Sequence, residues 1–243
     1  MTDTDQQERL RSKLGEIREE LSNVSDSVGE LENSLLLSSN AVEHLCLPGF
    51  EIDIEEWTTD DWQTPSKESK SIANLIRLDE LDILEPAAGT GQLIQFIEPL
   101  PGRTITAVEI KTGRVNRGKE RFSEQRDWVH WINKNFITYQ FQQKFDLILS
   151  NIPFSLKMEF IEKSLTLLRP EGRLLFLMPI DFNCGVENGN RWQQLDCHIH
   201  HVYVIHHRVA YLNAQGVPQK GRQVHDAVFD IRLGRQEGGR SFL

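Results

Sequence analysis

One short apolar segment that runs directly into a glycine turn limits the folds open to this chain more than any other feature. Residues 81–85 (LDILE) are apolar enough to predict a buried strand, and residues 86–91 (PAAGTG) are small and turn-forming. Gly89 and Gly91 allow the backbone to pass close to a ligand and to turn sharply into a helix. The turn lacks the third glycine of a dinucleotide fingerprint and the Lys-Ser/Thr pair of a phosphate loop, which argues against pyrophosphate and triphosphate ligands. A strand, a turn and a helix in this order predict an α/β fold.

Two further strand-like segments follow the glycine turn. Residues 104–109 (TITAVE) predict a second strand that ends in Glu109, about twenty residues beyond the turn. A carboxylate at this place in an open α/β sheet can accept hydrogen bonds from both hydroxyls of a ribose. Residues 128–132 predict a third strand, and Asn135 and Phe136 follow it.

A four-residue turn, Asn151-Ile152-Pro153-Phe154, comes directly after the apolar run at residues 145–150. The run predicts a buried strand because it is short and apolar and is ended by a proline, which cannot extend a ladder. At the carboxyl end of such a strand the turn brings together an amide, a backbone carbonyl and an aromatic face. These groups suit a planar exocyclic amine, since two oxygens accept its N–H bonds and a ring stacks on its base.

Taken together, these segments resemble the class I S-adenosylmethionine-dependent methyltransferases, and within them the DNA adenine-N6 (amino-group) branch. The resemblance covers roughly residues 57–234 and involves five motifs in the family's order. It implies a Rossmann-like sheet with helices on both faces, and methyl transfer from S-adenosylmethionine to the N6 amino group of adenine in DNA. It also implies a catalytic motif made of Asn151, Ile152, Pro153 and Phe154. The implied cofactor-binding residues are Thr64 and Pro65 at the methionine end, Glu85, Pro86, Ala87, Gly89 and Gly91 in the glycine-rich loop, Glu109 and the adjacent Ile110 at the ribose, and Asn135 and Phe136 at the adenine.

Two positions depart from the family's pattern. Ile152 stands where proline is usual, as in the ribosomal RNA adenine dimethyltransferases, so RNA is an alternative acceptor. That position contributes mainly its backbone carbonyl, and the expected chemistry is kept. Asn135 replaces an aspartate, and an amide can still hydrogen-bond the N6 group of the cofactor's adenine. Two further alternatives are N5 methylation of a protein glutamine on the same fold and a non-catalytic coiled-coil assembly module.

The charges are divided unevenly along the chain. The formal net charge is −9, but residues 1–62 contain 16 acidic and 4 basic residues, whereas the other 181 residues contain 20 and 23. The acidic excess belongs to an N-terminal extension, and the mildly basic remainder is compatible with a nucleic-acid partner. The chain is therefore expected to consist of a coiled-coil helix over residues 1–47, an acidic linker over residues 48–61, a methyltransferase domain over residues 62–235 and a tail over residues 236–243.

The N-terminal extension has a heptad pattern. Leucine, isoleucine and valine residues recur at alternating spacings of four and three from Leu10 to Leu35. This narrow stripe predicts a coiled coil through which the protein forms a homo-oligomer. The alternative is an amphipathic helix that packs back on its own domain.

Basic residues outside the extension indicate where a nucleic acid could contact the chain. One group follows the second strand, and two more basic residues lie in a later loop. They are Arg103, Lys111, Arg114, Arg117, Lys119, Arg121 and Arg126, and then Lys220 and Arg222. Such a group either contacts phosphates or forms a solvated helix face. Acceptor recognition is expected from the loops at residues 181–201 and 213–226, and residues 181–196 lack the periodicity of a helix.

The remaining composition bears on compartment and metals. Cys46, Cys184 and Cys197 are far apart and form no Cys-x-x-Cys pair, which favours a reducing, cytoplasmic compartment. No apolar run approaches membrane-spanning length, and the acidic N-terminus is unlike a signal peptide, so no membrane partner is expected. Five histidines lie between residues 198 and 207, but alternation along a strand puts only some of them on one face. No metal is therefore expected.

Overall fold

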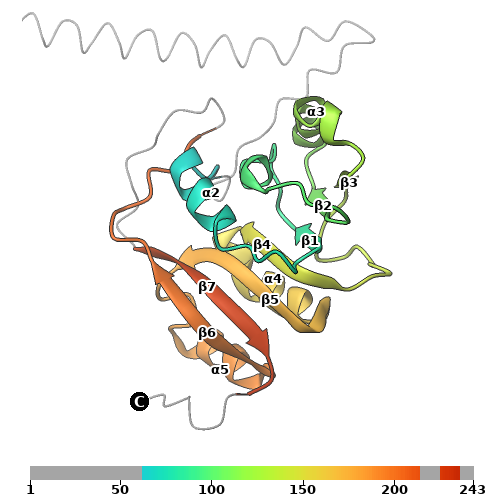
Figure 1. The fold of residues 1–243 in the computed structure, drawn as a ribbon. Coiled ribbons are helices and arrows are strands. Elements are labelled where there is room, and N and C mark those ends of the chain that lie inside the picture. The colour runs from blue at the N-terminus through green and yellow to red at the C-terminus, as the bar shows by residue number, and fades with distance from the viewer. Residues whose placement is uncertain (1–61, 214–224, 236–243) are drawn as a thin grey trace, which may run out of the picture. The chain divides into compact units, whose positions relative to one another are not determined.

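Seven strands form one sheet in the computed structural model, which describes residues 62–213 and 225–235 (Figure 1). The strands are β1 (Asp82–Glu85), β2 (Thr104–Glu109), β3 (Val129–Asn133), β4 (Phe145–Asn151), β5 (Leu168–Pro179), β6 (Cys197–Val204) and β7 (Asp226–Leu233). Their order across the sheet is β3-β2-β1-β4-β5-β7-β6. β7 runs antiparallel to β5 and β6, and the other neighbouring pairs are parallel.

The central strands are buried on both faces because their side chains alternate between two apolar layers. In β4, Leu147 and Leu149 pack into one layer and Ile148 packs into the other. β1 repeats the arrangement with Ile83 and Leu84. Strands buried on both faces are continuously apolar in sequence, which is why these segments can be recognised from the sequence alone.

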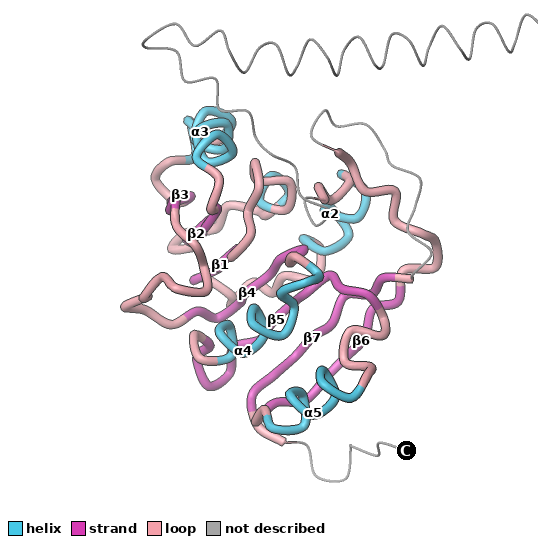
Figure 2. The backbone as a smooth tube through the Cα atoms, turned by 180° about the vertical axis from the view of Figure 1, so that it is seen from behind, coloured by secondary structure: helices cyan, strands magenta, loops and turns pink. Residues whose placement is uncertain are grey.

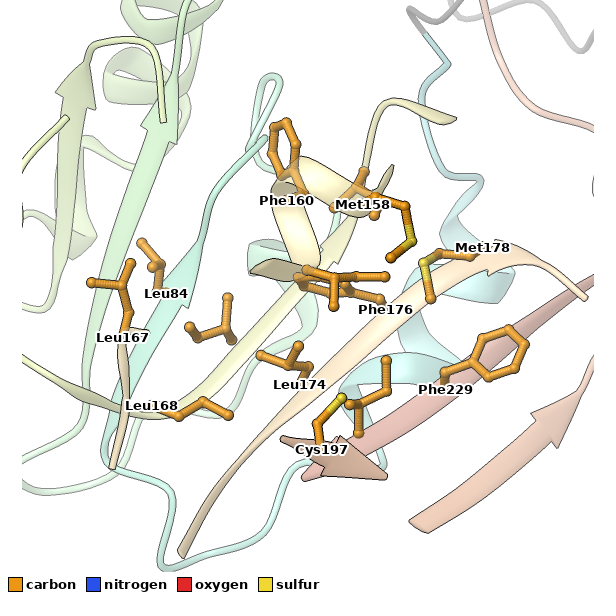
Figure 3. Packing of buried hydrophobic residues seen from close by; sticks show 14 of the residues in the cluster. Leu84, Met158, Phe160, Leu167, Leu168, Leu174, Phe176, Met178, Cys197 and Phe229 are labelled. Atoms are coloured by element: carbon orange, nitrogen blue, oxygen red, sulfur yellow. The ribbon is translucent and has the colours of Figure 1, made fainter. Parts of the chain in front are cut away.

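Helices cover both layers of the sheet. They are α2 (Ser66–Ala73), α3 (Thr112–Arg121), α4 (Lys157–Leu165) and α5 (Val186–Gln194), with short 3-10 turns η1 (Ile94–Phe96), η2 (Ser123–Gln125) and η3 (Phe154–Leu156). α4 and α5 lie on one face, in front of the strands in Figure 2. There Met158 of α4 packs beside Phe176 and Met178 of β5 (Figure 3). Ile72 of α2 and Ile94 of η1 pack into the opposite layer.

The α/β sheet expected from the sequence is confirmed, but three local expectations are wrong. The glycine turn does not lead directly into a helix, because residues 86–93 form successive turns and only the short η1 follows. Residues 181–196 are not a loop, since they contain α5. Residues 197–201, expected to belong to the same loop, lie in β6, and residues 205–213 leave the sheet.

Helix α5 is held by tertiary contacts that a periodicity argument does not detect. The guanidinium of Arg191 pairs with Glu159 and Glu162 of α4, at 2.8 and 2.9 Å. Trp192 is buried against the ring of Phe182, with the ring centroids 5.2 Å apart. One aromatic anchor and one charge pair thus stabilise a helix whose other side chains are mostly polar.

The predicted coiled coil over residues 1–47, the linker over residues 48–61 and the tail over residues 236–243 lie outside the described residues. The same holds for Lys220 and Arg222.

A buried ionic group joins the segment before β1 to β5 and β7. The guanidinium of Arg173 donates to the carboxylate of Glu80 at 2.6 and 3.2 Å and to the carboxylate of Asp230 at 2.9 Å. It also donates to the carbonyl of Leu75 at 2.6 Å. The three charged residues are between 1 and 3% exposed. Each charge is therefore compensated by its partners and not by water.

Replacing Arg173 with methionine should lower the free energy of unfolding by about 3–5 kcal/mol, because two buried carboxylates lose their buried cation and keep only the more exposed Arg77 and Arg232. Chemical denaturation monitored by circular dichroism measures the change. Arg232→Met is the matched control, since Arg232 also contacts Asp230 but is 31% exposed, and it should cost at most about 1 kcal/mol. Equal losses for the two variants would contradict the assignment.

Candidate active site

The carboxyl ends of β1 and β4 border a cavity of about 170 Å³. β2 lies on one side of β1 and β4 lies on the other, so the connections from these strands diverge and leave a crevice above the sheet. Most of the residues expected at a cofactor and acceptor site line this cavity. They are Thr64, Glu85, Pro86, Ala87, Gly89, Glu109, Ile110, Asn135, Phe136, Asn151 and Pro153.

Two glycines shape the turn that forms the floor of the cavity. Gly89 and Gly91 have φ angles of +55° and +85°, a region that side chains disfavour. A Cβ atom on Gly91 would also overlap the ring of Phe122 at the end of α3. The turn therefore needs glycine for conformation at both positions, and for space at Gly91.

The carboxylate of Glu109 ties the glycine turn to β2. Its Oε2 accepts from the backbone N–H of Gly89 at 2.9 Å, and its Oε1 accepts from the N–H of Lys111 at 2.8 Å. The side chain is 5% exposed. Each carboxylate oxygen has a second lone pair, so Glu109 can fix the turn and still accept from a ligand's hydroxyl groups.

Glu85 ends β1 and lines the cavity with an unsatisfied oxygen. Its Oε2 is buried and has no hydrogen-bond partner among the described residues. Burial raises the pKa of the Glu85 carboxyl well above its usual range, and the nearby charge of Glu109 raises it further. Glu85 is therefore a polar group kept available to whatever enters the cavity.

Asn151 lines the cavity, and the two polar atoms of its amide differ in their hydrogen bonding. Its Nδ2 donates to the backbone carbonyl of Trp62 at 3.1 Å. Its Oδ1 is buried and has no hydrogen-bond partner within the part of the chain that the structure describes. The tether leaves a preoriented acceptor oxygen at the carboxyl end of β4.

Asn135 and Phe136 form another side of the cavity. Phe136 is buried and stacks at a tilt on Phe160, with ring centroids 5.0 Å apart. The Oδ1 of Asn135 accepts from the N–H of Ile137 at 2.9 Å. The oxygen expected to contact the cofactor's adenine is thus already engaged in a backbone turn.

Four of the expected site residues do not line the cavity: Pro65, Gly91, Ile152 and Phe154. Phe154 is 7% exposed and packs edge-on against Tyr211, at 6.2 Å between ring centroids. Leu156, 43% exposed, lines the cavity beside Pro153 instead. The apolar surface next to Asn151 therefore comes from Pro153 and Leu156.

Other lining residues were not expected from the sequence as parts of the site. They are Trp62, Gln63, Ala88, Gln92, Leu93, Arg114, Lys134, Ile137, Leu156 and Phe160. Leu156 and Phe160 lie four residues apart just after the Asn151 motif, so helical spacing from that motif is a signal that would have found them.

The basic group after β2 does not act as one surface. Arg103 is 4% exposed and donates to the backbone carbonyls of Arg77, Glu80 and Glu98, so it stabilises the fold rather than contacting phosphate. Arg114 lines the cavity. Neither arginine therefore belongs to a solvated helix face, which was one of the two alternatives for this basic group.

Comparisons with known proteins agree with this geometry. Residues 83–172 match a family described as a methyltransferase domain, and no curated protein matches the sequence. A putative class I S-adenosylmethionine-dependent methyltransferase from Listeria monocytogenes has a TM-score of 0.56 at 14% identity, over 75% of this chain and 64% of that one. A putative RNA methyltransferase from Pyrococcus horikoshii has a TM-score of 0.54 at 12% identity, over 72% and 88%. An S-adenosylmethionine-dependent O-methyltransferase from Thermotoga maritima has a TM-score of 0.50 at 16% identity, over 70% and 66%.

At these identities the structural likeness establishes the fold, and this chain spans less than two thirds of the Listeria protein. The matched family model covers less than half of the chain, and the chain has the fold of the class I methyltransferases. The family match and this fold imply S-adenosylmethionine as the cofactor. The cavity suits that group, because it offers a buried oxygen of Glu85 without a partner among the described residues, the carboxylate of Glu109 and apolar surface at Phe136.

The described residues also bear on metal binding and on membrane insertion. Within residues 62–213 and 225–235, no three His, Cys, Asp or Glu side chains are grouped to hold a metal ion. Nδ1 of His198 hydrogen-bonds the carbonyl of Gly234, and Nε2 of His207 contacts Glu68. Among the described helices, none combines the length and the apolar character needed to cross a bilayer.

Replacing Glu85 with glutamine should stabilise the cofactor-free protein increasingly as pH rises. Because folding raises the pKa of Glu85, its contribution to stability is fully present below the ordinary glutamate pKa and is lost as pH rises toward the raised value. Melting temperatures of both proteins between pH 4 and pH 8 test this. The difference between them should grow with pH, whereas the exposed Glu98→Gln control should show no such growth. Parallel curves for wild type and Glu85→Gln would mean that folding does not raise the pKa of Glu85.

Proposed function

We propose that the protein transfers a methyl group from S-adenosylmethionine to the N6 amino group of adenine in DNA. The observation that carries the proposal is the Oδ1 of Asn151, an acceptor buried without a partner among the described residues beside the cavity. An exocyclic amine supplies the matching donor.

The chain's own residues orient the amine and exclude water. Oδ1 of Asn151 accepts one N–H hydrogen of the amine, which directs the nitrogen lone pair toward the methyl group. The backbone carbonyl of Ile152, expected as the second acceptor, belongs to a residue outside the cavity lining. Pro153 and Leu156 pack on the base after it has left its stack. S-adenosylmethionine, when bound, would supply a methyl group on a positively charged sulfur. As N6 bonded to this carbon, the carbon–sulfur bond would break, S-adenosylhomocysteine would leave with that electron pair, and the nitrogen would lose a proton to solvent.

Ile152 bears on the choice between DNA and RNA. Its side chain is 2% exposed and packs in the core, so the exchange of proline for isoleucine leaves the cavity wall unchanged. The same chemistry therefore serves adenine in RNA, which is the second candidate acceptor. The mildly basic balance of residues 63–243 suits either polymer.

Transfer of a tritiated methyl group to unmethylated DNA, RNA and protein, assayed in parallel, tests the proposal. Label in DNA that hydrolysis recovers as N6-methyladenine supports it. Label confined to RNA establishes the second candidate, and label confined to protein indicates a glutamine N5 acceptor. A protein that binds S-adenosylmethionine but labels none of them would be a non-catalytic module.

Asn151→Ala should lower the rate of transfer by roughly 10²–10³ and leave cofactor affinity nearly unchanged, because the lost acceptor faces the amine. Calorimetric titration and the transfer assay measure the two quantities separately. Asn151→Asp is the matched control, since it keeps an acceptor oxygen and should retain more activity than the alanine variant. An alanine variant as active as wild type would show that Asn151 does not accept a hydrogen bond from the reacting amine.

Glu109→Ala should weaken S-adenosylmethionine binding by about ten-fold or more, because ribose hydroxyls and the N–H groups of Gly89 and Lys111 all lose an acceptor. Calorimetry measures the affinity, and saturating cofactor should restore part of the turnover. Glu120→Ala, an exposed change on α3, is the control. Unchanged affinity in Glu109→Ala would show that the carboxylate only stabilises the turn.

A further inference from the structure

Two glutamines connect the glycine turn to the segment that precedes α2. The Nε2 of Gln92 donates to the Oε1 of Gln63 at 2.6 Å and to the Oγ1 of Thr90 at 2.9 Å. Both hydrogens of the Gln92 amide are therefore used. Gln92 follows Gly91 directly, and its side chain lines the cavity.

Gln63 is also held through its backbone. Its N–H donates to the carbonyl of Leu212 at 3.1 Å, and its carbonyl accepts from the N–H of Leu212 at 3.0 Å. This single bridge places residues 62–64 between the glycine turn and the segment at residues 205–213. Tyr211 supports the arrangement, since its ring lies 6.3 Å from that of Trp62 and its hydroxyl donates to Asp226 at 3.0 Å.

The residue just before Gln63 fixes the amide of Asn151. The carbonyl of Trp62 accepts from Asn151 Nδ2 at 3.1 Å. Oδ1 of the same amide therefore points away from this carbonyl. A shift of Gln63 moves this carbonyl, because the two residues share a peptide bond. The orientation of the acceptor oxygen thus depends on contacts made by Gln63.

We propose that Gln92 is a positioning residue: through Gln63 and the Trp62 carbonyl it orients the amide of Asn151 and couples the cofactor turn to acceptor binding. The inference rests on the proposed function. These four residues, Gln92, Gln63, Trp62 and Asn151, are called the amide clasp below. A displacement of an ångström in a reacting group costs roughly a hundred-fold in rate, so a side chain that touches no acceptor atom can control turnover.

Two substitutions of equal charge distinguish positioning from a general effect on the cavity. Gln92→Glu replaces the donor with a carboxylate that faces the acceptor oxygen of Gln63, so this hydrogen bond is lost in the observed orientation of the Gln63 amide. Gln63→Glu is the conservative variant, because its carboxylate can still accept from Gln92. Each variant adds one negative charge to the same contact.

Steady-state transfer, cofactor titration and thermal melting are measured on both full-length variants. Gln92→Glu should lower kcat by about ten-fold to a hundred-fold, with cofactor affinity and melting temperature within error of wild type. Gln63→Glu should stay within about three-fold of wild-type kcat, well under that loss. Equal losses in the two variants, or a loss of kcat that tracks lost cofactor affinity or lost stability, would overturn the proposal.

A readout that needs no acceptor separates this inference from the proposed function. The side-chain NH2 resonances of Asn151, assigned in a ¹⁵N–¹H spectrum by their disappearance in Asn151→Ala, should shift in Gln92→Glu and not in Gln63→Glu. Unshifted resonances in Gln92→Glu overturn the clasp. If wild type transfers no methyl group to DNA or RNA but the resonances shift as expected, the clasp holds and the proposed function fails.

Discussion

The Arg173 guanidinium, buried between Glu80 and Asp230, is the interaction on which the arrangement of this sheet most depends. Glu80 precedes β1, Arg173 lies in β5 and Asp230 lies in β7, so one charged group joins three segments far apart in the chain. A buried ion pair adds little net stability over an apolar substitute, but an unpaired charge there is costly. The group therefore disfavours other registers and fixes the start of β1 relative to β5 and β7.

Buried polar groups are paired near Arg173 but partly unpaired at the carboxyl ends of β1 and β4. Around Arg173 the charged atoms are paired with one another, whereas at the carboxyl ends Glu85 and Asn151 each keep one buried oxygen without a partner among the described residues. An unsatisfied buried polar atom costs about 1–3 kcal/mol in the empty protein. A ligand that supplies a hydrogen-bond donor removes this cost, so the unsatisfied oxygens favour ligand binding at the expense of the stability of the empty protein.

The candidate acceptor site is assembled from segments on both sides of the sheet's midline. Asn151 belongs to β4, but its amide is oriented by Trp62, and the amide clasp reaches Gln92 in the cofactor turn. Phe154, the aromatic residue of the same motif, supports this assembly from behind through Tyr211 rather than facing the cavity. Cofactor and acceptor binding therefore share one hydrogen-bonded framework.

Features that depend on local backbone chemistry, such as the glycine turn and the buried strands, can be predicted from the sequence alone. Gly89 is needed where φ is positive, and β4 is marked by an apolar run that a proline ends, so the sheet and most of the cavity's lining were predictable. Other features depend on contacts between residues that are far apart in the sequence, and these are visible only in the folded structure. Helix α5 is stabilised by contacts that Trp192 and Arg191 make outside the helix. Gln92 pairs with Gln63 across 29 residues, and no sequence periodicity predicts that pair. Local propensities do not specify such contacts, because they form only when the folded sheet brings the segments together.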